Sequence, residues 1–170
     1  MTQPPPIIRP IREADLPAYK ALRLEALQAH PEAYGSDYAD QAGDPDSVWM
    51  GRIQSSLEGK WSRIFLAEDS GEMAGLLAAY REKGAKVCHS ATLVSVYVRP
   101  RWRGRGLADQ MVQEAIAWSA SAGVRILRLT VVTSNTRAIR CYQRCGFRVC
   151  GIQPEVIRVG TQYHDELLMW

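Results

Sequence analysis

The chemistry that this sequence could perform is concentrated in residues 103–108, Arg-Gly-Arg-Gly-Leu-Ala, which we call the glycine turn. An apolar run ends just before it at Val98, and apolar residues at helical spacing follow it, so a strand is expected to turn directly into a helix. Such a turn presents unpaired backbone N–H groups at the positive end of a helix, where a pyrophosphate can bind. Glycine permits both the unusual backbone angles and the close approach of the ligand.

Two common phosphate-binding motifs do not fit the glycine turn. Position 109 is Asp109, which breaks the dinucleotide pattern G-x-G-x-x-G, and the lysine and hydroxyl residue of a P-loop are missing. If the two glycines are considered without their flanking elements, the alternative to an anion-binding turn is a plain surface loop with solvated arginines. A nucleic-acid binder is a further alternative, because arginines alternate at Arg99, Arg101, Arg103 and Arg105, although no recognised reading module accompanies them.

Two stretches together resemble the GNAT superfamily of N-acetyltransferases. Pro100-x-x-Arg103-Gly104-x-Gly106-x-Ala108 is similar to the family's acetyl-CoA pyrophosphate signature R-x-x-G-x-A, and Asn135-x-x-Ala138-x-x-x-Tyr142-x-x-x-Gly146-Phe147 is similar to its second cofactor motif. The resemblance implies an acyltransferase that moves acetyl from acetyl-CoA to a primary amine of a small molecule or peptide, by direct attack in a ternary complex. A non-catalytic acyl-CoA-binding sensor is the alternative from another functional class.

The resemblance also assigns residues to the cosubstrate acetyl-CoA. The N–H groups of the glycine turn would hold the pyrophosphate, with charge added by its two arginines, and Asn135 would bond the pantetheine. A strand that splays from its neighbour would offer unpaired backbone to the pantetheine and to the acetyl carbonyl. The implied acetyl-CoA-binding residues are Val96, Tyr97, Val98, Arg103, Gly104, Arg105, Gly106, Leu107, Ala108 and Asn135.

Tyr142 is the candidate general acid, both by the resemblance and by its spacing. Asn135, Ala138 and Tyr142 stand at i, i+3 and i+7, so they share one helix face on which the small Ala138 leaves room for a ligand. Transfer of acetyl from sulfur to nitrogen expels a thiolate, and a phenol with a pKa near 10 stays protonated at neutral pH and can supply the proton. The alternative is a buried tyrosine that packs on the sheet.

The general base is harder to assign. An alkyl amine with a pKa near 10.4 is almost entirely protonated at neutral pH, so a group must accept its proton. Many relatives use a glutamate on the strand before the signature, but residues 88–98 contain no carboxylate, and Ser95 occupies the expected position. Ser95 could order a water that relays the proton to a distant carboxylate. Glu68 and His89 are weaker candidates.

Selection of the acceptor is expected on the N-terminal side of the chain. An aromatic and acidic segment there could form a lid that suits a cationic amine, and Tyr34 is its candidate substrate-binding residue. A solvated surface loop is an equal alternative. The residues concerned are Glu32, Tyr34, Asp37, Tyr38, Asp40, Asp44 and Asp46.

The spacing of apolar and turn-forming residues predicts the elements that position these side chains. Helices are predicted at 16–27, capped by Asp15, and at 45–57, 104–122 and 135–145. Strands are predicted at 7–12, 63–68, 73–80, 87–98, 126–132, about 147–150 and 165–169. Antiparallel strands come first and a strand-helix-strand crossover follows. The prediction is an α/β fold of the GNAT type, with a central, mixed but mostly antiparallel sheet and helices on both faces.

Composition sets the remaining expectations. The 170 residues, 46% hydrophobic and 23% charged, suit one globular domain over 1–170 with a disordered tail at 1–6. No apolar run approaches the ~20 residues of a membrane span and no signal-peptide pattern begins the chain, so we expect a cytoplasmic protein without membrane or nucleic-acid partners. Four cysteines without metal-ligand spacing predict free buried thiols and no metal site. A homodimer is left open.

Overall fold

The computed structural model describes residues 5–170, so most of the tail predicted at 1–6 lies outside the described residues. The described chain forms seven strands and five α-helices. The strands are β1 (Ile7–Pro10), β2 (Ser62–Asp69), β3 (Glu72–Arg81), β4 (Ser90–Val98), β5 (Ile126–Val132), β6 (Val149–Val159) and β7 (Gln162–Met169). The helices are α1 (Leu16–Ala29), α2 (Tyr38–Ala42), α3 (Asp46–Glu58), α4 (Leu107–Ser121) and α5 (Thr136–Arg144).

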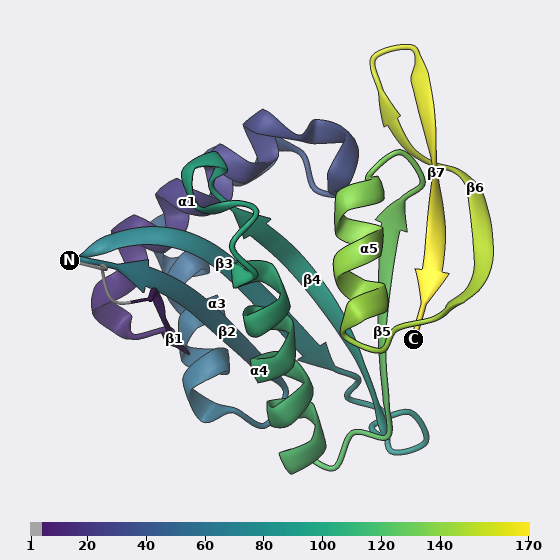
Figure 1. The fold of residues 1–170 in the computed structure, drawn as a ribbon. Helices are drawn as coiled ribbons and strands as arrows, with labels where there is room; N and C mark the ends of the chain where they lie inside the picture. The colour runs from purple at the N-terminus through teal and green to yellow at the C-terminus, as the bar shows by residue number, and fades with distance from the viewer. Residues whose placement is uncertain (1–4) are drawn as a thin grey trace.

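The strands line up in the order β1-β2-β3-β4-β5-β7-β6 (Figure 1). Neighbouring strands are antiparallel except for β4 and β5, which run parallel and are joined by the crossover through α4. The predicted mixed, mostly antiparallel sheet is therefore confirmed.

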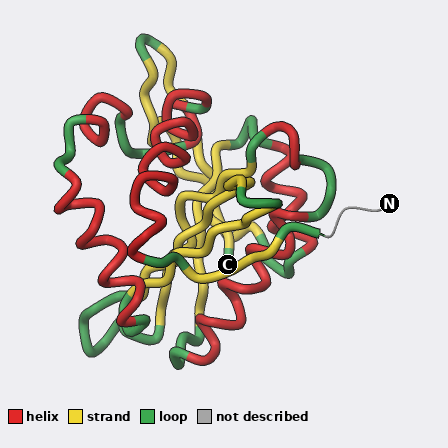
Figure 2. The backbone as a smooth tube through the Cα atoms, turned by 90° about the vertical axis from the view of Figure 1, so that its left-hand side faces the viewer, coloured by secondary structure: helices red, strands yellow, loops and turns green. Residues whose placement is uncertain are grey.

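Helices cover both faces of the sheet, as predicted (Figure 2). On one face α1 and α3 enclose a core that includes the fully buried Trp49, and on the other α4 packs through the fully buried Met111. Strands β2 and β3 are buried on both sides, because Leu66 faces the first core and Leu77 faces the second. The near-continuous apolar character of these strands follows from this double burial.

Three local predictions were wrong. The strand predicted at 87–98 begins at Ser90, because the N–H groups of Val87 and Cys88 bond the carbonyl of Gly84 and close a turn. The short C-terminal strands are longer than predicted and form the β6–β7 hairpin, which projects beyond the sheet (Figure 1). Asp15 does not cap α1 with its side chain, because its carboxylate accepts hydrogen bonds from Arg9 instead.

An irregularity in β4 shapes the site. The register with β3 shifts between Leu76 and Ala78, and Ser95 lies opposite this shift with a positive φ of 57°. A non-glycine residue with positive φ inside a strand marks a bulge, which redirects the side chains around it. None of the helices within residues 5–170 has the length and the apolar character that crossing a bilayer would require.

Candidate active site

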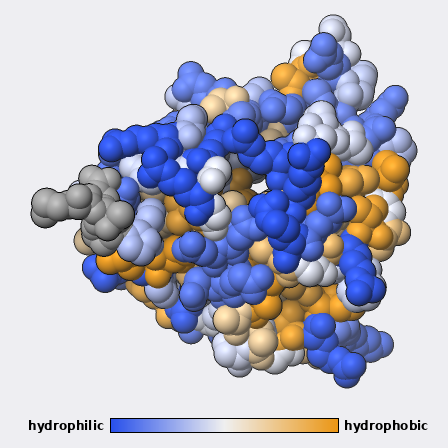
Figure 3. Space-filling view, in the orientation of Figure 1, coloured by the Kyte–Doolittle hydropathy of each residue, from blue (hydrophilic) through white to orange (hydrophobic). Residues whose placement is uncertain are grey.

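The site is an opening between β4 and β5. The two strands pair only from Ser90 to Thr92, opposite Ile126 to Arg128, and beyond these residues they diverge. A cavity of about 1110 Å³ begins there and is lined by both strands, the glycine turn, α5 and parts of α1 and α3. Its mouth is visible in Figure 3 as an opening rimmed mostly by hydrophilic residues. The splayed strand that the resemblance implied is thus present.

The glycine turn lies at one end of this cavity. Gly104 and Gly106 have φ values of 78° and 74°, and a Cβ atom added to either would meet no atom within 4 Å. Within residues 5–170, none of the N–H groups from Gly104 to Ala108 donates a hydrogen bond to another residue. Buried Leu107 and Trp102 anchor the turn on either side. Free N–H groups facing open space at the start of α4 form a suitable site for an anion.

The arginines around the turn divide among different partners. Arg99 bonds Glu25 at 2.7 Å, Arg101 pairs with Glu72 at 3.3 Å, and Arg103 donates to the carbonyl oxygen of Val98 at 2.7 Å. The predicted alternating stripe is therefore not a row of free cations.

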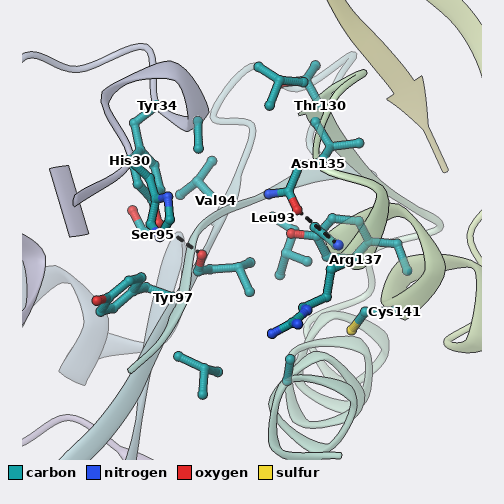
Figure 4. Close-up of a pocket in the computed structure, with 18 of the residues that line it drawn as sticks. His30, Tyr34, Leu93, Val94, Ser95, Tyr97, Thr130, Asn135, Arg137 and Cys141 are labelled. Carbon is teal, nitrogen blue, oxygen red and sulfur yellow. Dashed lines mark hydrogen bonds between the residues drawn. The ribbon is translucent and has the colours of Figure 1, made fainter. Parts of the chain in front are cut away.

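Two further arginines have no ion pair among the described residues. The first of them, Arg105, is exposed. Arg137 of α5 was not predicted, yet Figure 4 shows its guanidinium directed into the cavity.

α5 presents the predicted face to the cavity. Asn135, Ala138 and Tyr142 all line it. The side-chain oxygen of Asn135 caps α5 by accepting from the N–H of Ala138 at 3.1 Å, and Figure 4 shows its amide nitrogen directed toward the cavity. Asn135 can therefore cap the helix and still donate to a ligand.

Tyr142 is 6% exposed, and its burial raises the pKa of the phenol well above its ordinary value of 10.0. The hydroxyl is thus protonated throughout the neutral range, as a general acid requires. The aromatic ring packs edge-on against Phe147, with 6.0 Å between the ring centroids, which fixes its position at the wall of the cavity.

The end of β4 differs from the sequence-based prediction. Its carbonyl groups were expected to be unpaired, but the carbonyl of Val96 accepts from the Tyr34 hydroxyl at 3.1 Å and that of Val98 accepts from Arg103. Strand periodicity could not indicate either donor, because Tyr34 is distant in sequence and Arg103 folds back from the glycine turn. Tyr97 lines the cavity, and its hydroxyl donates to Glu25 at 3.0 Å. Ser95 lines the cavity, as predicted.

Tyr34 lines the acceptor side of the cavity, but the acidic lid around it was a wrong prediction. Of the residues proposed for the lid, none of the five acids lines the cavity. Asp44 pairs with Arg52 at 2.8 Å, Asp46 pairs with Lys20 at 2.7 Å, and Asp37 caps α2. These carboxylates form ion pairs and a helix cap among the N-terminal helices. On this side the cavity is lined instead by two arginines, Arg23 and Arg52.

Among the described residues, the carboxylates that line the cavity are Asp109 and Glu166. Asp109 accepts two hydrogen bonds from Arg144, at 2.7 and 2.9 Å, whereas Glu166 is 7% exposed and has no ion pair. The weaker candidates from the sequence lie elsewhere, since Glu68 pairs with Arg9 and His89 does not line the cavity. The sequence placed Glu166 in a C-terminal hairpin that could close one side of the pocket, but it indicated no chemical role, because β7 is brought beside β5 only by the fold.

His30 also lines the cavity without having been predicted there. One ring nitrogen lies 3.1 Å from the Arg103 guanidinium and the other 3.5 Å from Glu32. Figure 4 shows His30 beside Tyr34, on the β4 side of the cavity. Because both nitrogens have partners, His30 is better placed to orient Arg103 than to accept a proton from an amine.

The cysteines are free thiols in the described chain, although only Cys141 is fully buried. Cys141 and Cys145 lie one helical turn apart, with Asp109 close to both. Burial raises the pKa of Cys141 to about 12, and Arg144 already neutralises Asp109. A metal needs deprotonated thiolates, so these properties oppose a metal at this cluster.

Comparisons with known proteins agree with this geometry. The sequence profile of the acetyltransferase (GNAT) family matches residues 19–147. The L-amino acid N-acetyltransferase AaaT of Escherichia coli (strain K12) is 27% identical over 161 residues, 94% of each chain. The L-methionine sulfoximine/L-methionine sulfone acetyltransferase of Pseudomonas aeruginosa is 34% identical over 129 residues, covering 70% of this chain and 75% of the relative.

Similarity in three dimensions extends over nearly the whole chain. The structure of yncA from Salmonella typhimurium, determined with its cofactor acetyl-CoA, has a TM-score of 0.84 at 19% identity and covers 96% of this chain and 91% of that one. At this identity the likeness concerns the fold. With the family profile spanning most of the sequence, the chain belongs to the GNAT family of acetyltransferases.

Proposed function

We propose that this protein transfers the acetyl group of acetyl-CoA to the primary amine of a small acceptor, by direct attack while both substrates are bound. The observation that carries the proposal is the divergence of β4 and β5 beyond Thr92, which opens a cavity running from the glycine turn to Tyr34. One cavity of this size can hold both substrates at once. The names of the two relatives, which act on amino acids, support an amine acceptor.

The lining residues suit acetyl-CoA, which supplies the acetyl group as a thioester. The free N–H groups of the glycine turn would hold its pyrophosphate, and exposed Arg105 and cavity-lining Arg137 would add positive charge beside it. The amide nitrogen of Asn135 would donate to the pantetheine. Arg103, by contrast, would support the turn rather than bind the pyrophosphate, because its side chain is held by Val98 and His30 and its N–H donates to the carbonyl of Pro100.

Tyr142 would donate a hydrogen bond to the sulfur as the C–S bond breaks. The attacking amine nitrogen forms the new C–N bond, the electron pair of the C–S bond moves to sulfur, and the phenol supplies the proton that makes a free thiol. The raised pKa of Tyr142 keeps that proton available at neutral pH. Aimed donors of this kind contribute about 10²–10³ to rate.

Glu166 would accept the proton that the amine releases. It is a buried carboxylate at the cavity wall with no ion pair in the described chain, and water ordered by Ser95 can connect it to the amine. In this proposal the base belongs to β7 rather than to β4, the strand on which many relatives carry a glutamate. The predicted relay role of Ser95 is retained.

The proposal is tested by measuring free thiol released from acetyl-CoA by the purified chain, with and without a panel of primary amines. Release that depends on an added amine, together with the acetylated amine as product, is expected. Binding of acetyl-CoA without thiol release for any amine would favour the acyl-CoA sensor. The comparisons lend no support to that alternative or to the nucleic-acid binder.

A cytoplasmic location is part of the proposal, because the described cysteines are free thiols, which a reducing compartment preserves. The homodimer and the single domain over 1–170 stay predictions.

A further inference from the structure

Arg23 of α1 is a buried cation without a matching anion. Arg23 is 7% exposed, and its Nη1 atom has no hydrogen-bond partner among the described residues. Its one hydrogen bond is from Nε to the neutral side-chain oxygen of Gln41, at 3.2 Å. Buried charges in proteins are normally paired, because desolvation of an unpaired one is costly. Residues 5–170 therefore provide no anionic partner for this guanidinium.

The surroundings of Arg23 suit an anionic ligand. Arg23 lines the cavity together with Arg52 and the aromatic residues Tyr19, Tyr34 and Tyr80. Of the described carboxylates, none lines this end of the cavity, and Asp44, which is also absent from the lining, is engaged by Arg52 at 2.8 Å. Desolvation lowers the pKa of Arg23, as expected for a cation that nothing neutralises.

Arg23 also lies close to the position where acetyl transfer would occur. Its guanidinium carbon stands 4.8 Å from the centre of the Tyr34 ring, and the hydroxyl of the same tyrosine bonds the carbonyl of Val96 on β4. One phenol side chain therefore separates the guanidinium from the end of the splayed strand. A small acceptor could reach both at once, with its anion at Arg23 and its amine near the acetyl group.

We propose that Arg23 binds the carboxylate of the acceptor, so that the substrates of this enzyme are small amino acids that carry a carboxylate close to the reacting amine. This inference rests on the proposed acetyl transfer and adds to it the class of acceptor. The carboxylate satisfies the unpaired Nη1 atom and neutralises the buried charge.

The wild-type protein provides the first test. Thiol release is measured for each of the common L-amino acids and, in parallel, for its carboxamide and its decarboxylated amine. At least one amino acid is expected to exceed both of its analogues by tenfold or more in kcat/KM. Equal or better use of the analogues would overturn the inference and leave acetyl transfer itself intact.

Variants then assign the effect to Arg23. Arg23→Met and Arg23→Lys should lower kcat/KM for the preferred amino acid by at least tenfold, while changing turnover of its decarboxylated amine by less than threefold. Lys20→Met is the matched control, because Lys20 is a cation on the same helix that pairs with Asp46 outside the cavity. An equal loss for both substrates would show a structural role and contradict the proposal.

A binding measurement separates this inference from the transfer reaction. Calorimetry on protein saturated with CoA should detect the preferred amino acid but not its carboxamide. If no amine releases thiol, the transfer proposal fails, and the same titration with the amino-acid panel still decides the role of Arg23. Absence of binding, or equal binding of acid and amide, would refute the carboxylate site.

Discussion

Thr92 and Arg128 are the last facing residues of the parallel pair formed by β4 and β5. Up to this pair the strands share a ladder, and beyond it the sheet opens into the cavity. The bulge at Ser95 follows immediately and turns the end of β4 toward Tyr34. The place where strand pairing stops therefore decides where a thioester can enter the sheet.

Gly106→Ala should weaken acetyl-CoA binding by at least tenfold. A Cβ at this position has open space in the free protein, so the methyl group would project into the space assigned to the pyrophosphate. The positive φ adds a folding cost of about 1–2 kcal/mol. Gly71→Ala is the matched control, because Gly71 also has a positive φ of 84° and open space, but lies in the β2–β3 turn outside the cavity. Calorimetry and thermal unfolding of both variants separate strain from binding, and equal affinities would contradict the assignment.

Tyr142→Phe should reduce kcat by about 10²-fold and change the Kd for acetyl-CoA by less than threefold. The ring and its contact with Phe147 persist, and only the proton donor is lost. Tyr163→Phe, at an exposed residue of β7, should leave both quantities unchanged. Steady-state kinetics gives kcat and titration with acetyl-CoA gives Kd. An unaltered kcat in Tyr142→Phe would reject Tyr142 as the general acid.

The pH dependence of kcat follows from the pKa of Tyr142. Burial raises this pKa above the ordinary 10.0, so the phenol keeps its proton as the pH rises to 10. Its catalytic form is present below the raised pKa and is lost only above it. We therefore expect no descending limb of kcat between pH 7 and pH 10. A descending limb in that interval that disappears in Tyr142→Phe would show that the phenol titrates normally.

Glu166→Gln should lower kcat/KM at pH 7 by about 10²-fold or more, because a carboxamide cannot accept the amine proton. Activity should recover as the pH approaches the pKa of the free amine, since a neutral amine needs no base. Glu155→Gln, on the exposed surface of β6, is the control. The pH profile of kcat/KM tests this, and a uniform loss at every pH would indicate a structural role for Glu166.

Local patterns were sufficient to predict most of the framework. The positions of α4 and β5 follow from residues within each element, and the spacing of Asn135, Ala138 and Tyr142 placed all three at the cavity. Glycines flanking an arginine at the end of a strand indicated the anion site. These features depend on neighbours within about one or two helical turns.

The acceptor side could not be predicted in the same way. Arg23 precedes Leu24 on an amphipathic helix, and its hydrogen-bond partner Gln41 lies on α2, a five-residue helix too short for a periodic signal. The acids near Asp44 looked like a lid because their cationic partners lie on other elements. Glu166 reaches the cavity only through pairing of β7 with β5. Contacts between distant segments carry no local signature.

Binding of the CoA pyrophosphate at the glycine turn can be observed directly from the backbone amide signals when CoA is titrated into isotope-labelled protein. If the glycine turn holds the pyrophosphate, the largest chemical-shift changes will fall on residues whose N–H groups have no partner in the described chain, namely Gly104, Arg105, Gly106, Leu107 and Ala108. Amides of the β2–β3 turn should not move. Saturable binding of CoA that leaves the amides of residues 104–108 unperturbed would show that this turn does not hold the pyrophosphate.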